Sequence, residues 1–311
     1  MPSDQTGTSL DAIRAALART IGRWTEGVED RSTPIADLLF FRREGPTPPG
    51  ICRVEPSVVL VVQGKKRMLA GDDAYAYDRD HFLIASLDVP ASSQVLEASP
   101  KRPCLGLTLK LDLRLLAELV PQVHLAAREE RSAAKGMALG AVTPPLLDAF
   151  MRLTDLLDEP DAIDVLAPLV RRELHYRLLT SDQAGRLRQI ASVGSQSHAI
   201  ARAIEWLKVN YAAPLRIAEL AARVHMSPSS LHQHFRQLTA MSPLQYQKWL
   251  RLNEARRVML NEGFDAAGAA FKVGYESPSQ FSREYARLFG APPRRHVVSL
   301  RSKAAASQLS P

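Results

Sequence analysis

The order of apolar and polar positions divides the chain into an N-terminal helix, a β-rich stretch, further helices and a helical C-terminal third. In the first 28 residues, apolar side chains recur every three or four positions, from Leu10 to Val28. This spacing predicts an amphipathic helix with one buried face. The Thr8-x-x-Asp11 sequence favours a capping box at its start.

Short runs rich in β-branched and aromatic residues follow between Ser57 and Leu111. They are SVVLVV, KRMLA, AYAY, HFLIASL, SSQVLEAS and CLGLTLKL, separated by turn signals such as Gly71-Asp72-Asp73. Short strands at this spacing predict a β-sandwich or barrel built from hairpins. From Asp112 to Ile190 the periodicity is helical again, with a break at Asp158-Glu159-Pro160. The small, polar residues 191–197 are interpreted as a linker.

The C-terminal third contains an internal repeat at an offset of fifty residues. Residues 227–243 match residues 277–293: both copies begin with Ser-Pro-Ser and both end in proline. Serine at the N-cap and proline at the first helical position are favoured where a helix begins. Leu231, Phe235 and Leu238 share one face of the first helix. Phe281, Tyr285 and Leu288 share the equivalent face of the second.

The opposite faces of these two helices carry polar side chains suited to the edges of bases in a major groove. They are Ser229, His232, Gln233 and Arg236 in the first helix, and Ser279, Ser282, Arg283 and Arg287 in the second. Each helix follows a short helix rich in small residues and a tight turn, which is typical of a helix-turn-helix. A continuous helical pattern from Pro243 to Gly263 joins the two units. Its length of about 30 Å approaches the ~34 Å of one DNA turn.

Charge supports a nucleic-acid partner for this third of the chain. The whole chain carries +7 at pH 7, but residues 199–311 contain 16 Lys and Arg against 7 Asp and Glu. The remaining residues are slightly acidic. An excess of positive charge confined to one module is typical of a DNA-binding domain joined to a neutral partner domain.

At these residues the chain resembles the AraC/XylS-type transcription regulators. The resemblance rests on MSPSSLHQHFRQLTAMSPLQYQKWLRLNEARRVML and VGYESPSQFSREYARLFGAPPRR. The β-rich stretch is similar to the cupin-like N-terminal domain of one subfamily. The resemblance implies that the first three residues named on each outward face contact bases.

The resemblance also implies an α+β fold: a cupin-like β-barrel with flanking and linker helices, then an all-α domain of two helix-turn-helix units joined by a long helix. We expect a sensor and dimerisation domain over residues 1–190, a DNA-binding domain over 199–298 and a disordered tail over 299–311. The expected partners are double-stranded DNA, a second copy of the chain, a small-molecule effector and, if the protein activates transcription, RNA polymerase.

Three positions depart from the usual family pattern. Ala240 stands where glycine is usual, and His296 stands where tyrosine is common. Gly268 lies inside the short helix that precedes the second helix of the repeat. Glycine inside a helix lowers its stability by about 1 kcal/mol relative to alanine.

No catalytic, metal or cofactor site is predicted, and the chain is not expected to be an enzyme. His232 and His234 are two residues apart on a helix and point in nearly opposite directions, so they cannot share a zinc ion. The β-rich stretch offers only His81 as an imidazole ligand. With no secretory signal and no membrane-spanning run, the expected location is the cytoplasm.

The nature of the effector stays open at this point. The strands SVVLVV and HFLIASL suggest an aliphatic lining and a small, mainly apolar ligand, whereas the alternative is a filled barrel that binds nothing. Cys52 and Cys104 are interpreted as buried, reduced thiols, with a redox or electrophile sensor as the alternative. Two rival functions remain: an enzyme carried by a DNA-binding module, and an architectural protein that binds DNA without sequence preference.

Overall fold

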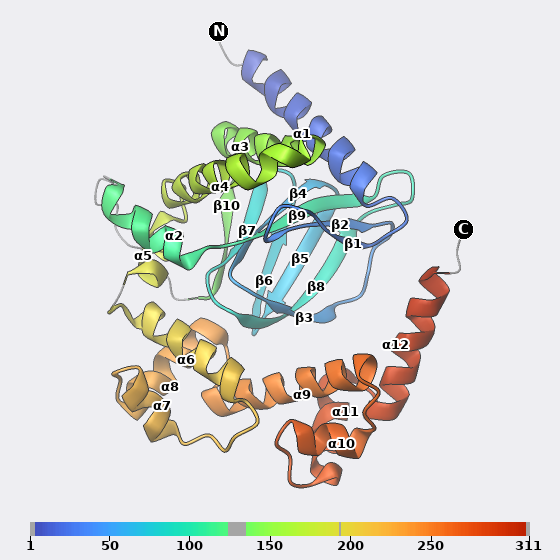
Figure 1. Ribbon diagram of the computed structural model, residues 1–311, viewed down its shortest axis with the longest axis vertical. Coiled ribbons are helices and arrows are strands. Elements are labelled where there is room, and N and C mark those ends of the chain that lie inside the picture. The colour runs from blue at the N-terminus through green and yellow to red at the C-terminus, as the bar shows by residue number, and fades with distance from the viewer. Residues whose placement is uncertain (1–3, 124–134, 193, 309–311) are drawn as a thin grey trace. The chain divides into compact units, whose positions relative to one another are not determined.

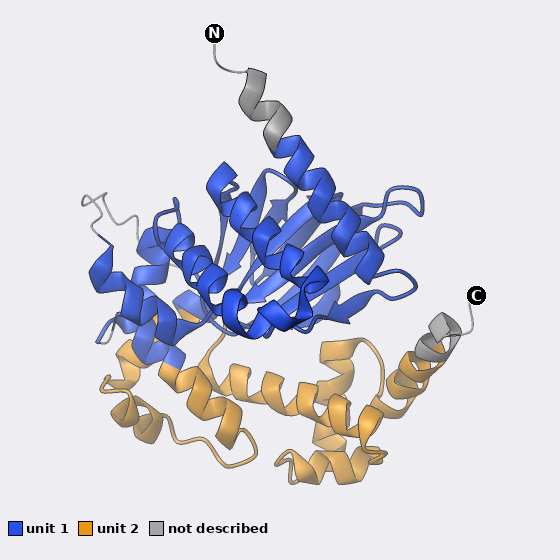
Figure 2. Ribbon diagram, turned by 45° about the horizontal axis from the view of Figure 1, so that its top comes forward, with its two compact units in different colours: residues 1–201, 237–240 blue, residues 202–236, 241–311 orange. Residues whose placement is uncertain are grey.

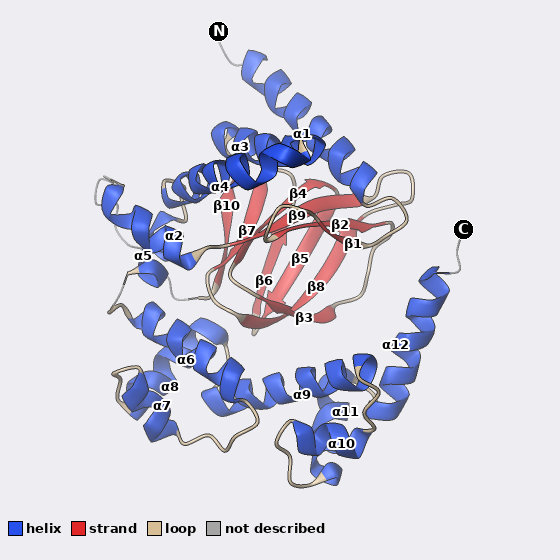
Figure 3. Cartoon of the chain, viewed as in Figure 1, coloured by secondary structure: helices blue, strands red, loops and turns tan. Residues whose placement is uncertain are grey.

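The computed structural model describes residues 4–123, 135–192 and 194–308. The chain forms two compact units (Figure 2). The first comprises residues 1–201 with 237–240, and the second comprises residues 202–236 and 241–311. Strands are confined to the first unit and the second is helical (Figure 3), so the predicted α+β class is confirmed.

Two antiparallel sheets make up the centre of the first unit (Figure 1). The six-stranded sheet has the order β1-β2-β9-β4-β7-β10, and the four-stranded sheet has the order β3-β8-β5-β6. The strands are β1 Asp30–Ser32, β2 Leu38–Arg43, β3 Gly50–Val54, β4 Ser57–Gln63, β5 Lys65–Ala70, β6 Asp73–Tyr77, β7 His81–Ala85, β8 Val89–Glu97, β9 Cys104–Lys110 and β10 Met137–Ala141. The six runs predicted from the sequence correspond to β4 to β9.

Four strands, β1, β2, β3 and β10, were not predicted from the sequence. β10 lies in the segment expected to be helical, and its MALGA sequence has good helix formers. Its full-length antiparallel pairing with β7 overrides that local preference. β2 pairs along its whole length with β9, and β1 and β3 are likewise held by neighbouring strands.

Helices cover the outer face of the six-stranded sheet. α1 (Asp4–Trp24), α3 (Pro144–Asp155) and α4 (Ile163–Leu179) lie on this side (Figure 1). Alternate residues of β4 and β9, such as Leu60 and Leu107, join Leu17 of α1 and Phe150 of α3 in one buried apolar cluster. The intervening residues point to the other sheet, because successive side chains of a strand alternate between faces.

The capping box predicted for α1 is wrong. The helix begins at Asp4, so Thr8 and Asp11 lie inside it. The helix ends at Trp24, where Thr25 donates a hydrogen bond from its hydroxyl to the carbonyl of Ile21 at 2.7 Å. The apolar stripe itself is correct up to Trp24, and Val28 beyond it is exposed.

Shorter helices complete the first unit. They are α2 Leu113–Leu119, the 3-10 turns η1 Val120–Gln122, η2 Leu156–Asp158 and η3 Pro160–Ala162, and α5 Ala184–Ala191. Buried His175 of α4 accepts a hydrogen bond at Nε2 from the backbone N–H of Asp112 at 2.9 Å, which ties the start of α2 to α4. The predicted linker is shorter than expected, because α6 (Gln196–Asn210) begins within it; Val193 lies outside the described residues.

The second unit consists of helices joined by short turns. They are α7 Ile217–Arg223, α8 Pro228–Thr239, α9 Pro243–Asn261, α10 Ala266–Lys272, α11 Pro278–Phe289 and α12 Pro293–Gln308. α12 continues through residues 299–308, where we expected a disordered tail. Arg301 donates hydrogen bonds to the carbonyls of Met259 (2.7 Å) and Leu260 (3.2 Å), and the alanine-rich sequence beyond it favours helix. Residues 309–311 lie outside the described residues.

Candidate nucleic-acid interface and barrel cavity

Each half of the C-terminal unit is a pair of helices joined by a tight turn. In the first, α7 turns into α8 through His225, which has a positive φ of 57°, and the N–H of Met226 donates to the carbonyl of Ala221 at 2.9 Å. In the second, α10 turns into α11 through Gly274, with φ 88°, and the N–H of Tyr275 donates to the carbonyl of Ala270 at 2.9 Å. The repeat found in the sequence is therefore a structural repeat.

Serine caps fix the start of both predicted recognition helices. The hydroxyl of Ser227 accepts from the N–H of Ser230 at 3.2 Å, and the hydroxyl of Ser277 accepts from the N–H of Gln280 at 3.3 Å. Pro278 occupies the first helical position of α11. These contacts satisfy backbone donors that a helix leaves unpaired at its N-terminus.

The apolar faces of α8 and α11 are buried as the sequence predicted. Leu231, Phe235 and Leu238 are buried in α8, and Phe281 and Tyr285 are buried in α11. Leu288 is only half-buried. Phe281 packs edge-on against Tyr275 at 5.4 Å between ring centroids, which holds α11 against the turn before it.

The opposite faces are open to solvent. Ser229, His232, Gln233 and Arg236 of α8 are exposed, as are Ser279, Arg283 and Arg287 of α11, while Ser282 is half-buried. We call these eight residues the outward set. Within the described residues, no ion pair or hydrogen bond engages the guanidinium of Arg283. The structure thus brings the outward set onto two equivalent helix faces, each available to a ligand.

A single long helix connects the two halves. α9 has 19 residues, about 28 Å at 1.5 Å per residue, and a capping box of Ser242 and Gln245 begins it. This length agrees with the sequence prediction.

Two polar side chains of α9 attach it to the loop between α6 and α7. Arg251 donates to the carbonyls of Tyr211 (2.7 Å), Ala212 (3.1 Å), Ala213 (3.0 Å) and Gly274 (2.8 Å). Buried Gln247 donates to the carbonyls of Tyr211 (3.0 Å) and Ala213 (2.7 Å). A Cβ at Gly274 would collide with the carbonyl oxygen of Ala212, so only glycine allows this close approach. Sequence reasoning missed Arg251 as a positioning residue, since an arginine on a basic helix looks like a phosphate contact.

Comparison with known proteins agrees with this geometry. Residues 34–186 match the family model described as the AraC-type transcriptional regulator N-terminus, and residues 220–297 match that of a helix-turn-helix domain. This chain belongs to the AraC/XylS family.

Individual relatives of the AraC/XylS family match over different lengths. The transcriptional activator RhaS of Pectobacterium carotovorum is 25% identical over 246 residues, which are 76% of this chain and 83% of that protein. The HTH-type transcriptional regulator YneL of Escherichia coli is 73% identical over 37 residues, only 12% of this chain and 63% of that relative.

Solved structures of the regulator ToxT from Vibrio cholerae have a similar fold. An apo structure of a ToxT point variant aligns with a TM-score of 0.59 at 10% identity, over 86% of this chain and 99% of that one. A ToxT structure with an unsaturated fatty acid bound has a TM-score of 0.55 at 8% identity, over 84% of this chain and 93% of that one.

The three departures from the AraC/XylS pattern have local explanations. Ala240 has a left-handed φ of 60°, and the equivalent position after α11 is Gly290 with φ 77°. His296 keeps an aromatic role, because it stacks on Phe289 at 5.2 Å and hydrogen-bonds the hydroxyl of Tyr285 at 3.0 Å. Gly268 is the third residue of α10, and its N–H donates to the capping carboxylate of Asp265 at 2.7 Å. A Cβ there would crowd that carboxylate, so alanine would not recover the full helix propensity we assigned.

Replacing Ala240 by glycine is expected to raise the free energy of unfolding by about 1 kcal/mol, because glycine adopts the left-handed conformation without the steric cost of a Cβ. The thermal midpoint of the full chain measures this. Ala222→Gly, at an exposed position of helix α7, is the matched control and should destabilise by about 0.5–1 kcal/mol. A lower midpoint for Ala240→Gly would contradict the interpretation.

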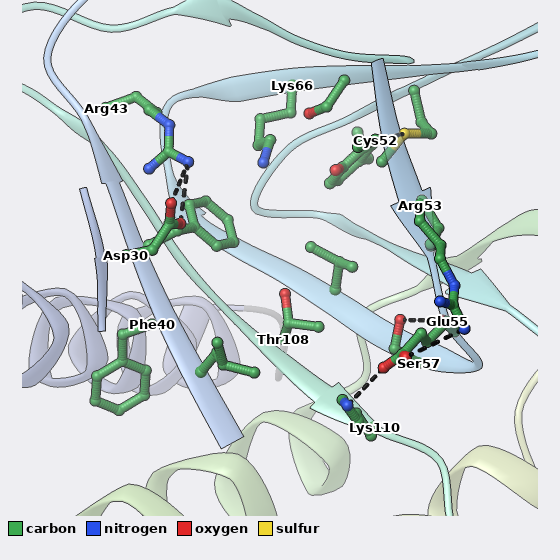
Figure 4. Close-up of a pocket in the computed structure, with 17 residues that line it drawn as sticks. Asp30, Phe40, Arg43, Cys52, Arg53, Glu55, Ser57, Lys66, Thr108 and Lys110 are labelled. Carbon is green, nitrogen blue, oxygen red and sulfur yellow. Dashed lines mark hydrogen bonds and ion pairs between the residues drawn. The ribbon is translucent and has the colours of Figure 1, made fainter. Parts of the chain in front are cut away.

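A cavity of about 480 Å³ lies between the two sheets of the AraC-type N-terminal unit (Figure 4). Its lining comes from strands of both sheets. Ser57 and Val59 of the SVVLVV strand contribute as predicted, but the HFLIASL strand does not line it. Charged side chains from Asp30 to Lys110 also face it, so the expected mainly aliphatic lining is wrong. The inward positions of β5 carried the missed signal: Lys66 and Met68 share one face of the strand.

Most charges around this cavity are paired within the protein. Arg43 binds Asp30 through Nη2, which lies 2.9 and 3.0 Å from the two carboxylate oxygens. The Nζ of Lys110 lies 2.5 Å from Oε2 of Glu55. Arg53 forms three hydrogen bonds of 2.6 to 2.9 Å with the buried carboxylate of Asp88. Within the described residues, Lys66 takes part in no ion pair, and its Nζ lies 4.1 Å from the centroid of the Phe41 ring.

Cys104 is buried as expected, whereas Cys52 is less buried than expected. Burial raises the pKa of Cys104 to about 11, so its thiol stays protonated at neutral pH and reacts slowly. Cys52 is half-buried, with its sulfur 3.9 Å from that of Met68.

No group of three or more His, Cys, Asp or Glu in the described ranges could hold a metal ion. The described helices include none with the length and apolarity needed to cross a membrane.

Proposed function

We propose that this AraC/XylS-family protein is a sequence-specific transcription regulator whose outward set reads DNA and whose barrel binds a small effector. Residues 199–298 form the DNA-binding domain in this proposal, and residues 1–190 form the regulatory and dimerisation domain. The observation that carries it is the repeat of two capped helices, α8 and α11, each with a buried apolar face and an exposed polar face. Arginine, amide and hydroxyl groups on such faces can bond base edges in the major groove.

The proposal assigns DNA affinity and specificity to different side chains. Contacts of Lys and Arg with phosphates supply most of the affinity, whatever the sequence. Hydrogen bonds from the outward set to bases supply the specificity. Relatives such as RhaS are named as transcriptional activators. We therefore propose that this protein activates transcription, with RNA polymerase as a further partner. We also propose that it acts in the cytoplasm.

The cavity between the two sheets supports the effector part of the proposal. Its volume of about 480 Å³ lies within the ~300–1,000 Å³ typical of small-ligand sites. ToxT, whose fold is similar, has been crystallised with an unsaturated fatty acid and with a naphthyl-substituted butenoic acid. A small organic ligand is therefore the kind of effector we propose for this chain.

Fluorescence anisotropy of the full chain on two duplexes tests this function. One duplex is the region upstream of the protein's own gene and the other is a scrambled control, each measured over a salt series. Binding at least about 10³-fold tighter to the upstream duplex is expected of a specific regulator. Equal, weak and strongly salt-dependent binding to both duplexes would instead favour an architectural protein.

An exposed apolar patch on α4 supports a homodimer through the N-terminal unit. Val165 and Leu169, one helical turn apart, are 67% and 62% exposed, and Leu166 and Tyr176 are also exposed. Clustered exposed apolar side chains on a helix are typical of a protein interface. We propose that α4 packs against its copy in a second chain.

The double change Val165→Glu and Leu169→Glu is expected to weaken dimerisation at least about 100-fold, because a two-fold interface repeats each buried charge in both subunits. Sedimentation over a concentration series measures this. Asp164→Asn, at an exposed position of the same helix, should leave the dimer intact. An unchanged dimer in the double variant would place the interface elsewhere.

A further inference from the structure

Among the described residues, two polar groups of the cavity between the sheets lack a matching polar partner: Tyr77 has no hydrogen-bond acceptor, and Lys66 contacts the Phe41 ring but no carboxylate. The side chain of Tyr77 is fully buried and lines the cavity, and no described group accepts a hydrogen bond from its hydroxyl. Lys66 lines the same cavity and has no carboxylate partner in the described part of the chain. Figure 4 shows its amine directed into the space between Arg43 and Cys52.

Lys66 and Tyr77 lie close enough together to bind one ligand group. Lys66 on β5 and Tyr77 on β6 are directly paired in the antiparallel register. Side chains paired in this way stand on the same face of the sheet, with Cβ atoms about 5 Å apart.

The unsatisfied hydroxyl of Tyr77 is costly to the protein, because it is buried away from water. Burial lowers the pKa of Lys66, because the ammonium form loses its hydration. Burial raises the pKa of Tyr77 well above its usual range. The phenol therefore keeps its proton and can donate a hydrogen bond. A ligand oxygen carrying negative charge would accept from both and supply the missing counter-charge.

The rest of the lining fits an apolar body beside that oxygen. Leu39, Phe41, Val59 and Met68 line the cavity along with the paired charges described above. The other cationic side chains of the lining, Arg43, Arg53 and Lys110, already hold carboxylates of the protein. The lining therefore offers one cation without a carboxylate partner beside several apolar side chains.

We propose that the effector is a small monocarboxylate with an apolar body, and that Lys66 and Tyr77 bind its carboxylate inside the barrel. This inference rests on the proposed effector-controlled function and names the chemical class of the effector. One ammonium balances the single charge of a carboxylate, whereas the second charge of a phosphate monoester would stay buried without compensation.

Isothermal titration of the full chain with matched probes tests the proposal. The probes are hexanoate and octanoate, with hexan-1-ol and octan-1-ol as uncharged partners that carry the same apolar bodies. We expect at least one carboxylate to bind ten-fold or more tightly than its alcohol. Equal affinities, or binding of the alcohols alone, would overturn the proposal.

Variants assign the effect to the two residues. Lys66→Met should weaken carboxylate binding at least ten-fold and leave alcohol binding within two-fold, and Tyr77→Phe should weaken carboxylate binding several-fold. Lys65→Met is the matched control, because Lys65 precedes Lys66 on β5 and does not line the cavity, and it should bind like the parent protein. Lys66→Met without ligand should also have an unchanged or higher thermal midpoint, since it removes a partly buried charge that has no carboxylate partner among the described residues. Carboxylate binding that survives Lys66→Met would overturn the assignment.

Anisotropy on the upstream and scrambled duplexes separates this inference from the function on which it rests. If the protein prefers one duplex but no carboxylate binds, the carboxylate proposal fails and specific regulation stands. If a carboxylate binds but no duplex is preferred, the ligand class is correct and the regulatory function fails.

Discussion

Replacing Arg283 by alanine is expected to weaken binding to the preferred duplex about 5- to 150-fold, or about 1–3 kcal/mol. Arg283 is exposed on the outward face of α11, and no described side chain competes for its guanidinium. A guanidinium can bond O6 and N7 of one guanine together, which no other base offers in the major groove. Anisotropy on the preferred and scrambled duplexes measures the loss, which should be much smaller on the scrambled one.

Arg283→Lys provides the control for charge. Lysine keeps the positive charge but lacks the planar fork that binds guanine at two points. We therefore expect Arg283→Lys to restore binding to scrambled DNA while leaving most of the loss on the preferred duplex. An equal loss on both duplexes for the alanine variant would instead assign Arg283 to a phosphate contact.

Replacing Arg251 by alanine is expected to destabilise the C-terminal unit by roughly 3 kcal/mol. Its guanidinium holds four backbone carbonyls, and hydrogen bonds to a charged group contribute about 1.5–3 kcal/mol each, with less than additive effect when they share one donor group. The loop between α6 and α7 and the turn before α11 would lose their shared contact. Hydrogen exchange of the full chain should show faster exchange in both segments.

Arg257→Ala is the matched control on the same helix. Arg257 is exposed and binds Glu254 and Glu262 on the surface, where ion pairs contribute only about 0–1 kcal/mol. Its removal should leave exchange in those two segments unchanged. If Arg251→Ala behaves like this control, the four hydrogen bonds do not hold the unit together.

The sequence predicted the C-terminal unit more accurately than the N-terminal one, for a physical reason. In α8 and α11 the buried faces, serine caps and exposed positions all repeat along the chain, so periodicity alone reveals them. β10 and β2 depend on partners more than forty residues away in the sequence, and their local composition gives little sign of pairing. The turn at Ala240 shows the same limit, because its left-handed backbone follows from the end of α8 and not from the residue.

The two candidate sites, the outward set and the cavity, were also predicted from the sequence with different accuracy. The positions of the outward set followed from helical geometry, and their predicted contacts with DNA stay predictions. The cavity was anticipated, but its lining was not, because charged residues such as Arg43 and Lys110 occupy inward positions of strands that otherwise look like ordinary half-exposed strands. Only the packing of the two sheets shows that Lys66 and Tyr77 face one cavity.

The uninterrupted helix α9 restricts which mutations the C-terminal unit can tolerate. Each residue added to or deleted from a helix turns everything beyond it by about 100° and shifts it by about 1.5 Å. One deletion in α9 would therefore rotate α11 far from its orientation relative to α8 and would also misplace Arg251. Single substitutions on the exposed side of α9, such as at Arg257, leave the length of the helix unchanged. The orientation of α11 relative to α8 then also stays unchanged. The exposed positions of α9 can thus accept substitutions, whereas the length of the helix cannot change.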